Sequence, residues 1–281
     1  MTTLAGRLPD TLSLGPVRLR VSDRARTGQW LEQVLGLLAP TDAGWCTPDG
    51  RLLVQLDEVP GARPVPDRGR VGLYHYAILL PSRADLGRLL RHLEARGHPL
   101  GASDHLASEA LYLKDPDGIT VEVYADRPRE QWVRDGDYLA LAVDPIDRDG
   151  LLRAAGSSAW EGVPVGTVMG HQHFYVSDLA LAERHYVGVW GFDVMARLAQ
   201  GALFVSAGGY HHHLGLNVWA AHTPTAGPGD AGLSEWNVQL GSEDALAALQ
   251  ARLEAAGLPF RREGVELLTT DPWGLTARVR G

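Results

Sequence analysis

The chain has 281 residues, of which 45% are hydrophobic and 21% charged, a composition that is ordinary for a globular protein and excludes extended disorder. Its formal net charge of −8 and pI near 5.7 argue against nucleic acid or an anionic membrane as the main partner. The single cysteine excludes an internal disulfide, and no apolar run approaches the ~20 residues that span a membrane. The first residues lack the basic and apolar regions of a signal peptide, so we do not expect secretion. We therefore expect a cytoplasmic protein that is large enough for two compact domains.

The first half of the chain predicts two units, each made of a strand, a helix and three further strands. In the first unit the helix is expected at 29–35, and a linker rich in Pro and Gly follows at 61–69. In the second unit a β-type run at 72–80 precedes a stripe with the i, i+3, i+4, i+7 spacing of an amphipathic helix, formed by Leu86, Leu89, Leu90 and Leu93. The remaining strands of the second unit are expected near residue 100, at 110–113 and at 119–124, with turn residues at 115–118.

The second half repeats this order of elements. Helices are expected at 179–189 and around 246–253, and the Pro- and Gly-rich segment 223–232 separates these two units. The segment between the halves is too long to be structureless in a compact protein, so we expect part of it to pack. The chain is thus predicted to be an α+β protein with three parts, which are a domain at 10–128, a connector at 129–167 and a domain at 168–281.

Internal repetition supports this division, because stretches of the chain are imperfect copies of one another. The repeated pairs are 15–23 with 170–178, 34–37 with 189–192, 93–99 with 253–259, and 115–118 with 271–274. The copies differ at two informative positions, where Pro16 corresponds to His171 and Glu122 corresponds to Arg278. Metal-binding side chains are therefore retained only in the two middle units.

The four βαβββ units resemble the vicinal oxygen chelate superfamily, which includes glyoxalase I, bleomycin-resistance proteins and type I extradiol dioxygenases. Within this superfamily the chain is most similar to the four-repeat bacterial catechol 2,3-dioxygenase-like proteins. The motifs that carry the resemblance are YHYAILL at 74–80, SDH at 103–105, SEALYL at 108–113, DPDG at 115–118, EVYADRP at 122–128 and FVSAGGYHHH at 204–213. The resemblance runs from about residue 10 to the C-terminus and implies two glyoxalase-like domains, but a fold alone does not settle the reaction.

The resemblance also implies that metal ligands occupy the first and the last strand of a repeat. In the second repeat these positions hold His75 and Glu122, and in the third they hold His171 and His213. If the repeats pair in sequence order, the third and fourth would offer His171, His213 and Glu235. If the second repeat pairs with the third, His75, Glu122 and His171 converge with His213 beside them. We favour the second arrangement, because the outer repeats then face each other and hold no metal-binding set, only Pro16, Val54, Glu235 and Arg278.

Two histidines and one carboxylate form the ligand set of non-haem Fe(II) oxygenases, so Fe(II) is expected, with Mn(II) as the alternative and O₂ as co-substrate. Resemblance to the extradiol enzymes implies that His213 transfers protons near the O₂ site, that Tyr112 contacts the substrate and that His105 lies near the metal ligands. Side chains alternate along a strand, which would place His211 on the same face as His213, with His212 on the other. His211 shares a face with His213, and His173 shares a face with His171. Either could therefore take the place of a chosen residue or lie directly behind the metal ligands.

The leading hypothesis is a metal-dependent extradiol ring-cleaving dioxygenase that acts on a small catechol or hydroquinone-type aromatic. The alternative is a glyoxalase-type isomerase or lyase, in which His213 would be a fourth metal ligand. A third hypothesis is a non-catalytic small-molecule-binding protein of the bleomycin-resistance kind, which the intact ligand set disfavours. The expected partner is a small aromatic molecule rather than nucleic acid or a membrane, and assembly of identical copies stays open.

Overall fold

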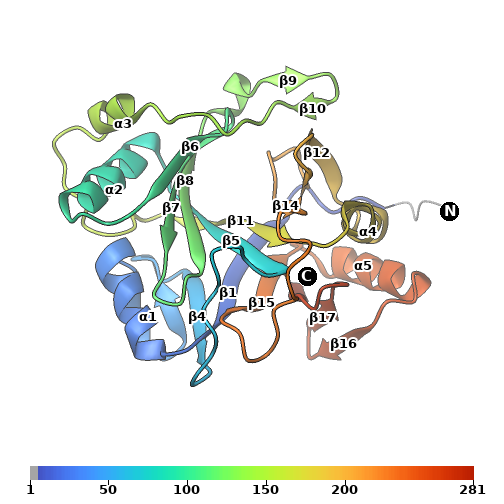
Figure 1. Ribbon diagram of the computed structural model, residues 1–281. Helices are drawn as coiled ribbons and strands as arrows, with labels where there is room; N and C mark the ends of the chain where they lie inside the picture. The colour runs from blue at the N-terminus through green and yellow to red at the C-terminus, as the bar shows by residue number, and fades with distance from the viewer. Residues whose placement is uncertain (1–5) are drawn as a thin grey trace.

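The computed structural model describes residues 6–281 and contains two eight-stranded sheets, each built from two βαβββ repeats (Figure 1). The first repeat consists of β1 (Ser13–Val21), α1 (Arg24–Trp30), η1 (Leu31–Leu35), β2 (Leu38–Thr41), β3 (Gly44–Cys46) and β4 (Leu52–Glu58). The second consists of β5 (Gly72–Leu79), α2 (Arg83–Ala95), β6 (Gly101–Asp104), β7 (Ser108–Lys114) and β8 (Thr120–Asp126).

The second half of the chain has the same plan. The third repeat consists of β11 (Val168–Tyr175), α4 (Leu179–Glu183), η3 (Arg184–Trp190), β12 (Asp193–Leu198), β13 (Ala202–Ser206) and β14 (Leu214–Asn217). The fourth consists of β15 (Gly232–Gln239), α5 (Glu243–Ala255), β16 (Phe260–Glu263), β17 (Glu266–Thr270) and β18 (Thr276–Arg280). The predicted α+β class and the four repeats are confirmed.

The repeats pair in a nested way. One sheet has the order β12-β13-β14-β11-β5-β8-β7-β6 and therefore joins the third repeat to the second; we call it the inner sheet. The other has the order β16-β17-β18-β15-β1-β4-β3-β2 and joins the fourth repeat to the first; we call it the outer sheet. First strands meet at both seams, since β5 pairs antiparallel with β11 and β1 with β15. The favoured pairing of repeats is thus confirmed.

The leucine stripes form the buried faces of the two long helices, as predicted. Leu86, Leu89 and Leu93 of α2 are fully buried, and so are the corresponding leucines of α5. The side chain of Ser82 accepts a hydrogen bond from the backbone N–H of Asp85 and caps the start of α2. Full burial of a leucine side chain contributes roughly 1.5–3 kcal/mol, so each stripe holds its helix against a sheet.

The repeats that are adjacent in sequence are tied together at equivalent turns. Ser22, after β1, donates from its hydroxyl to Asp117 over 2.6 Å. In the second half Trp273 occupies the position of Asp117 and donates from its indole nitrogen to the hydroxyl of Ser177 over 2.8 Å. The different turn sequences DPDG and DPWG therefore make the same contact with opposite hydrogen-bond polarity. These contacts link the inner sheet to the outer sheet.

Part of the connector packs, as expected. It contains η2 (Arg129–Gln131), the hairpin of β9 (Arg134–Asp135) and β10 (Tyr138–Leu139), and α3 (Arg148–Ala154). Leu151 of α3 is fully buried, and the helix lies beside α2 (Figure 1). In the described part of the chain, every helix is too short or too polar to cross a membrane. The division into domains at 10–128 and 168–281 stays a prediction.

A buried histidine in η3 should make the fold sensitive to acid. Burial lowers the pKa of His185 to about 4, from an ordinary value of 6.5. The unfolded chain binds a proton between these two values and the folded chain does not, so stability is lost as the pH falls from about 6.5 towards 4. His185→Leu should therefore abolish about 2 kcal/mol of the stability difference between pH 7 and pH 5, as measured by urea unfolding. His222→Leu is the control on an exposed side chain, and an equal effect there would contradict the prediction.

Candidate metal centre

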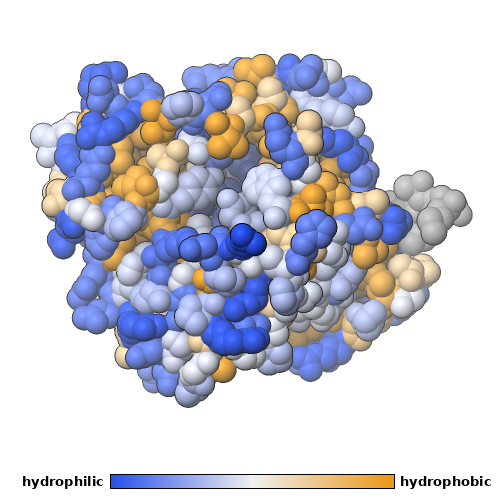
Figure 2. Space-filling model, in the orientation of Figure 1, coloured by the Kyte–Doolittle hydropathy of each residue, from blue (hydrophilic) through white to orange (hydrophobic). Residues whose placement is uncertain are grey.

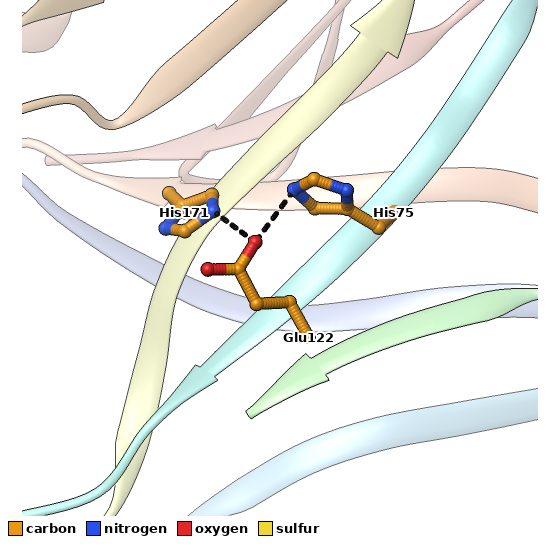
Figure 3. A group of neighbouring side chains, drawn as sticks. All are labelled: His75, Glu122 and His171. Atoms are coloured by element: carbon orange, nitrogen blue, oxygen red, sulfur yellow. Dashed lines mark hydrogen bonds and ion pairs between the residues drawn. The ribbon is translucent and has the colours of Figure 1, made fainter. Parts of the chain in front are cut away.

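Three adjacent strands at the middle of the inner sheet bring together the three predicted ligands. His75 lies on β5, Glu122 on β8 and His171 on β11, and the exposed fractions of their side chains are 3%, 2% and 1%. Their tips point toward one another (Figure 3). One carboxylate oxygen, Oε2 of Glu122, lies 2.9 Å from Nε2 of His75 and 3.1 Å from Nε2 of His171. Residues that are far apart in sequence thus converge on one buried point.

The donor set and its spacing fit a transition-metal ion. One ligand atom from each of the three residues lies within 4.8 Å of the other two. Two donors that each lie ~2.1 Å from an ion and subtend a right angle are about 3.0 Å apart, which matches the two nitrogen–oxygen distances. Apart from its contact with Glu122, Nε2 of His75 is buried without a hydrogen-bond partner among the described residues. Binding of an ion would give this nitrogen and the facing atoms of Glu122 and His171 a common partner.

The protonation states at this point also suit a cation. Burial opposes the charge on Glu122, but His171 and His75 outweigh it and hold the pKa of this carboxyl well below its usual range. Burial lowers the pKa of His171 to about 4. Near neutral pH the carboxylate is therefore ionised and the imidazole of His171 is neutral, which are the forms that bind metals.

A cavity of about 390 Å³ opens onto these three residues. Its other lining residues come from the inner sheet and from the connector; they include Tyr74, Ser103, His105, Tyr112, Leu141, Val143, His173, Leu198, Phe204, His211, His212 and Trp219. Figure 2 shows that this face of the molecule is hollowed near its centre, with apolar residues along the upper rim. The cavity is large enough for a single aromatic ring with a substituent.

Tyr112 and His105 line the cavity together, and their predicted roles toward the substrate and the metal ligands stay predictions. Tyr112 lies beside Glu122 in the pairing of β7 with β8. The Nδ1 atom of His105 lies 2.6 Å from the carbonyl oxygen of Ala142, so Nδ1 carries the proton. The hydroxyl of Tyr112 then donates to Nε2 of His105 over 2.6 Å. Burial, reinforced by Glu122, raises the pKa of Tyr112 well above its usual value, so the phenol keeps its proton.

His213 does not line this cavity, which corrects the predicted position of this residue. Its Nδ1 atom lies 2.8 Å from the hydroxyl of Ser206 and also accepts from the backbone N–H of Ala207. The assumed register was wrong by two residues, because β14 begins only at Leu214 and residues 207–213 form a loop. The acid–base role assigned to His213 stays a prediction that this geometry does not favour.

The position of Glu122 is occupied in the third repeat by a glycine. Glu122 pairs with Ala77, which lies two residues beyond His75, and Gly215 pairs with His173, which lies two residues beyond His171. A Cβ atom at Gly215 would lie 2.7 Å from the ring of His173, so the absence of a side chain leaves room for that ring. The third repeat therefore has no side chain at the place where a fourth ligand would stand.

Two neighbours of His213 face the cavity instead. His211 contacts the carboxylate of Asp126 through Nε2 at 2.8 Å, and its Nδ1 lies 2.7 Å from Nδ1 of His212. When the His211 ring is neutral and its Nε2 donates to Asp126, its Nδ1 is the acceptor, so that His212 donates from Nδ1 and its Nε2 carries no proton. The ring of His212 lies against that of the predicted ligand His171, with 4.1 Å between the centroids. The prediction that His212 points away from the site is wrong.

His173, the other alternative, belongs to the wall of the cavity. The side-chain oxygen of Asn217 accepts from the backbone N–H of Trp219, so its amide group faces Nε2 of His173 at 3.0 Å. This nitrogen therefore accepts a hydrogen bond and is not free to bind an ion.

The corresponding place in the outer sheet holds an ion pair. Arg278 binds Glu235 through two hydrogen bonds of 2.6 and 2.9 Å and also contacts Glu263 at 3.0 Å. Among residues 6–281, His75, Glu122 and His171 are the one group with the donors and spacing for a metal ion. The first and fourth repeats therefore form an outer cup around Glu235 and Arg278, and a cavity of about 480 Å³ remains open in it beside Arg278.

Comparison with known proteins agrees with this fold and this sequence pattern. Residues 13–123 match the family model described as the Glyoxalase/Bleomycin resistance protein/Dioxygenase superfamily. A catechol-2,3-dioxygenase of Bacillus subtilis (strain 168) is 42% identical over 267 residues, which cover 92% of this chain and 93% of that protein.

Two solved structures share the fold at low identity. One is a B. subtilis protein provisionally described as a dioxygenase, with a TM-score of 0.64 and 12% identity over 98% of this chain and 86% of that one. The other is glyoxalase I from Zea mays, with a TM-score of 0.54 and 14% identity over 96% of this chain and 92% of that one. The chain therefore belongs to the glyoxalase, bleomycin resistance protein and dioxygenase superfamily, within which it resembles the four-repeat catechol 2,3-dioxygenases.

Proposed function

We propose that this protein is an extradiol dioxygenase that opens the ring of a small catechol beside one of its hydroxyl groups, with both atoms of O₂ entering the product. The observation that carries the proposal is the convergence of two imidazoles and one carboxylate, from His75, His171 and Glu122, on a cavity of aromatic size. The name of the B. subtilis relative supports the same reaction. These three residues would hold Fe(II), or Mn(II) in its place, and leave other coordination positions open.

The bound ion would supply Lewis-acid and redox chemistry toward the catechol and O₂. The residues around it prepare the site for that chemistry. Glu122 provides a negative charge next to the two imidazole donors. Tyr112, whose hydroxyl is held by His105, presents a phenol to one side of the cavity. On the other side, His212 offers an unprotonated nitrogen for proton transfer, and the pair of His211 with Asp126 fixes its tautomer.

A glyoxalase-type reaction with four protein ligands receives less support. The fourth position holds Gly215, and the predicted fourth ligand, His213, is hydrogen-bonded outside the cavity. A binding protein without catalytic activity is the outcome that remains if a catechol binds without being turned over.

Protein purified without O₂ and loaded with Fe(II) should consume one O₂ per catechol and form a yellow ring-opened product. The measurement is O₂ uptake with a panel of catechols, together with metal analysis, and the same protein loaded with Mn(II) decides between the two ions. Bound metal with no O₂ consumption for any catechol would refute ring cleavage.

A further inference from the structure

The cavity in front of the candidate metal centre has both polar and apolar lining residues. The second repeat contributes polar groups such as Tyr112 and His105. Four apolar side chains from the third repeat and the connector also line the cavity; we call them the apolar wall, and they are Leu141, Val143, Leu198 and Phe204. Leu141 and Leu198 pack against Phe204 in one hydrophobic cluster. A catechol whose hydroxyl groups face the metal ligands would direct its ring substituents to this wall.

Cationic side chains are missing from this cavity. Within the described part of the chain, no lysine or arginine lines it, and its one carboxylate is that of Glu122. The nearby Arg127 is neutralised by Asp104 through two contacts of 2.7 Å. Arg129 lies over the rings of Trp132 and Tyr210 and does not line the cavity.

Three of the histidines in the lining are already hydrogen-bonded within the protein. His105 uses both ring nitrogens, one with Ala142 and one with Tyr112. Nε2 of His173 accepts from Asn217, and His211 contacts Asp126 and His212. A carboxylate on the substrate would therefore lose its water here without gaining a partner of opposite charge.

We propose that the cavity selects catechols whose substituents are uncharged and apolar, such as alkyl, aryl or halogen groups, and rejects catechols that carry a carboxylate. This inference rests on the proposed function, and it specifies the substrate class of the same site. Its physical basis is the cost of burying an ion without a counter-ion. An acid pays this cost, whereas its uncharged ester makes the same other contacts without it.

The test compares two substrates of nearly equal size, 3,4-dihydroxyphenylacetate and its methyl ester, in O₂-uptake assays with the Fe(II)-loaded protein. The ester should have a kcat/KM at least ~100-fold higher than the acid, as expected for an unpaired buried charge. The comparison keeps the catechol ring and its two hydroxyl groups constant, so it isolates the charge of the substituent. Equal values for acid and ester would overturn the proposal.

Introducing a positive charge at the apolar wall makes the test specific to this cavity. Val143 lines the cavity but is 67% exposed, so Val143→Arg should fold normally. The new guanidinium should raise kcat/KM for the acid by at least ~10-fold relative to the ester, since it gives the carboxylate a partner. Val143→Met controls for side-chain length without charge. Val265→Arg places the same charge on an exposed valine in the turn between β16 and β17 and should leave the acid-to-ester ratio of the unmodified protein unchanged.

A second arginine variant tests whether the effect depends on the exposed position of Val143. Leu198→Arg places the cation on the strand β12 side of the wall, and it should shift the ratio in the same direction. No shift in either arginine variant would contradict the proposal. If no catechol is turned over, the proposed reaction fails independently, and anaerobic calorimetry with acid and ester still decides the selectivity. Tighter binding of the ester by a similar factor supports it, and equal binding refutes it.

Discussion

Replacing Glu122 with glutamine should remove the bound metal and abolish O₂ consumption. The substitution keeps the shape of the side chain but replaces an ionised donor with a neutral amide, beside two buried imidazoles that have no other acceptor there. Loss of a partner that only orients a ligand costs 10–100-fold in metal affinity, so loss of the anionic ligand should cost at least about 100-fold. Metal analysis after dialysis, combined with O₂ uptake, measures both effects.

The outer sheet provides a matched control for this variant. Glu235 is a glutamate of the outer cup that is held by Arg278. Glu235→Gln should therefore leave the metal content and the turnover as they are in the unmodified protein. Loss of metal in Glu235→Gln, or full retention in Glu122→Gln, would show that the ion is bound elsewhere than proposed.

A second large effect should distinguish two neighbouring histidines. His212→Gln should retain the metal and lower kcat by ~10²- to 10⁴-fold, because it removes the nitrogen that is placed to transfer a proton beside His171. His213→Gln should change kcat by less than about tenfold, since His213 is hydrogen-bonded to Ser206 outside the cavity. Glutamine is suitable at both positions because it can keep a hydrogen bond without acting as an acid or base near neutral pH.

Turnover and metal content must be measured on the same samples, with circular dichroism to verify folding. A loss of metal in His212→Gln would mean that this residue acts through His171 or as a ligand. The reverse result, in which His213→Gln loses turnover and His212→Gln does not, would restore the assignment made from sequence spacing.

Much of the architecture was predictable because it depends on patterns of residue type. The leucines of α2 recur with helical spacing, which identifies a buried face without any knowledge of what covers it. The pairing of the second repeat with the third followed from Pro16 and Arg278, which cannot bind a metal and therefore place the ligands in the inner repeats. The convergence of His75, Glu122 and His171 required only that pairing and the strand positions.

The acid–base histidine could not be assigned in the same way. Spacing from Gly209 to His213 matched that from Gly118 to Glu122, but the match assumed a continuous strand. Gly208 and Gly209 both have positive φ angles, of +61° and +65°, so the chain turns there and strand alternation does not apply. The pair of glycines before the three histidines was the available indication of a loop, yet it does not define which imidazole faces the cavity.

The nested pairing of repeats has a consequence for synthesis of the chain. The inner sheet can form from one continuous stretch, since its strands run from β5 to β14. By contrast, β1 emerges first but must wait for β15 before one of its edges is covered. An unpaired strand edge is a template for aggregation, and the entropy of closing a long loop delays its pairing. Nascent chains that stop before β15 should therefore depend on chaperones, although their metal-binding residues are already complete.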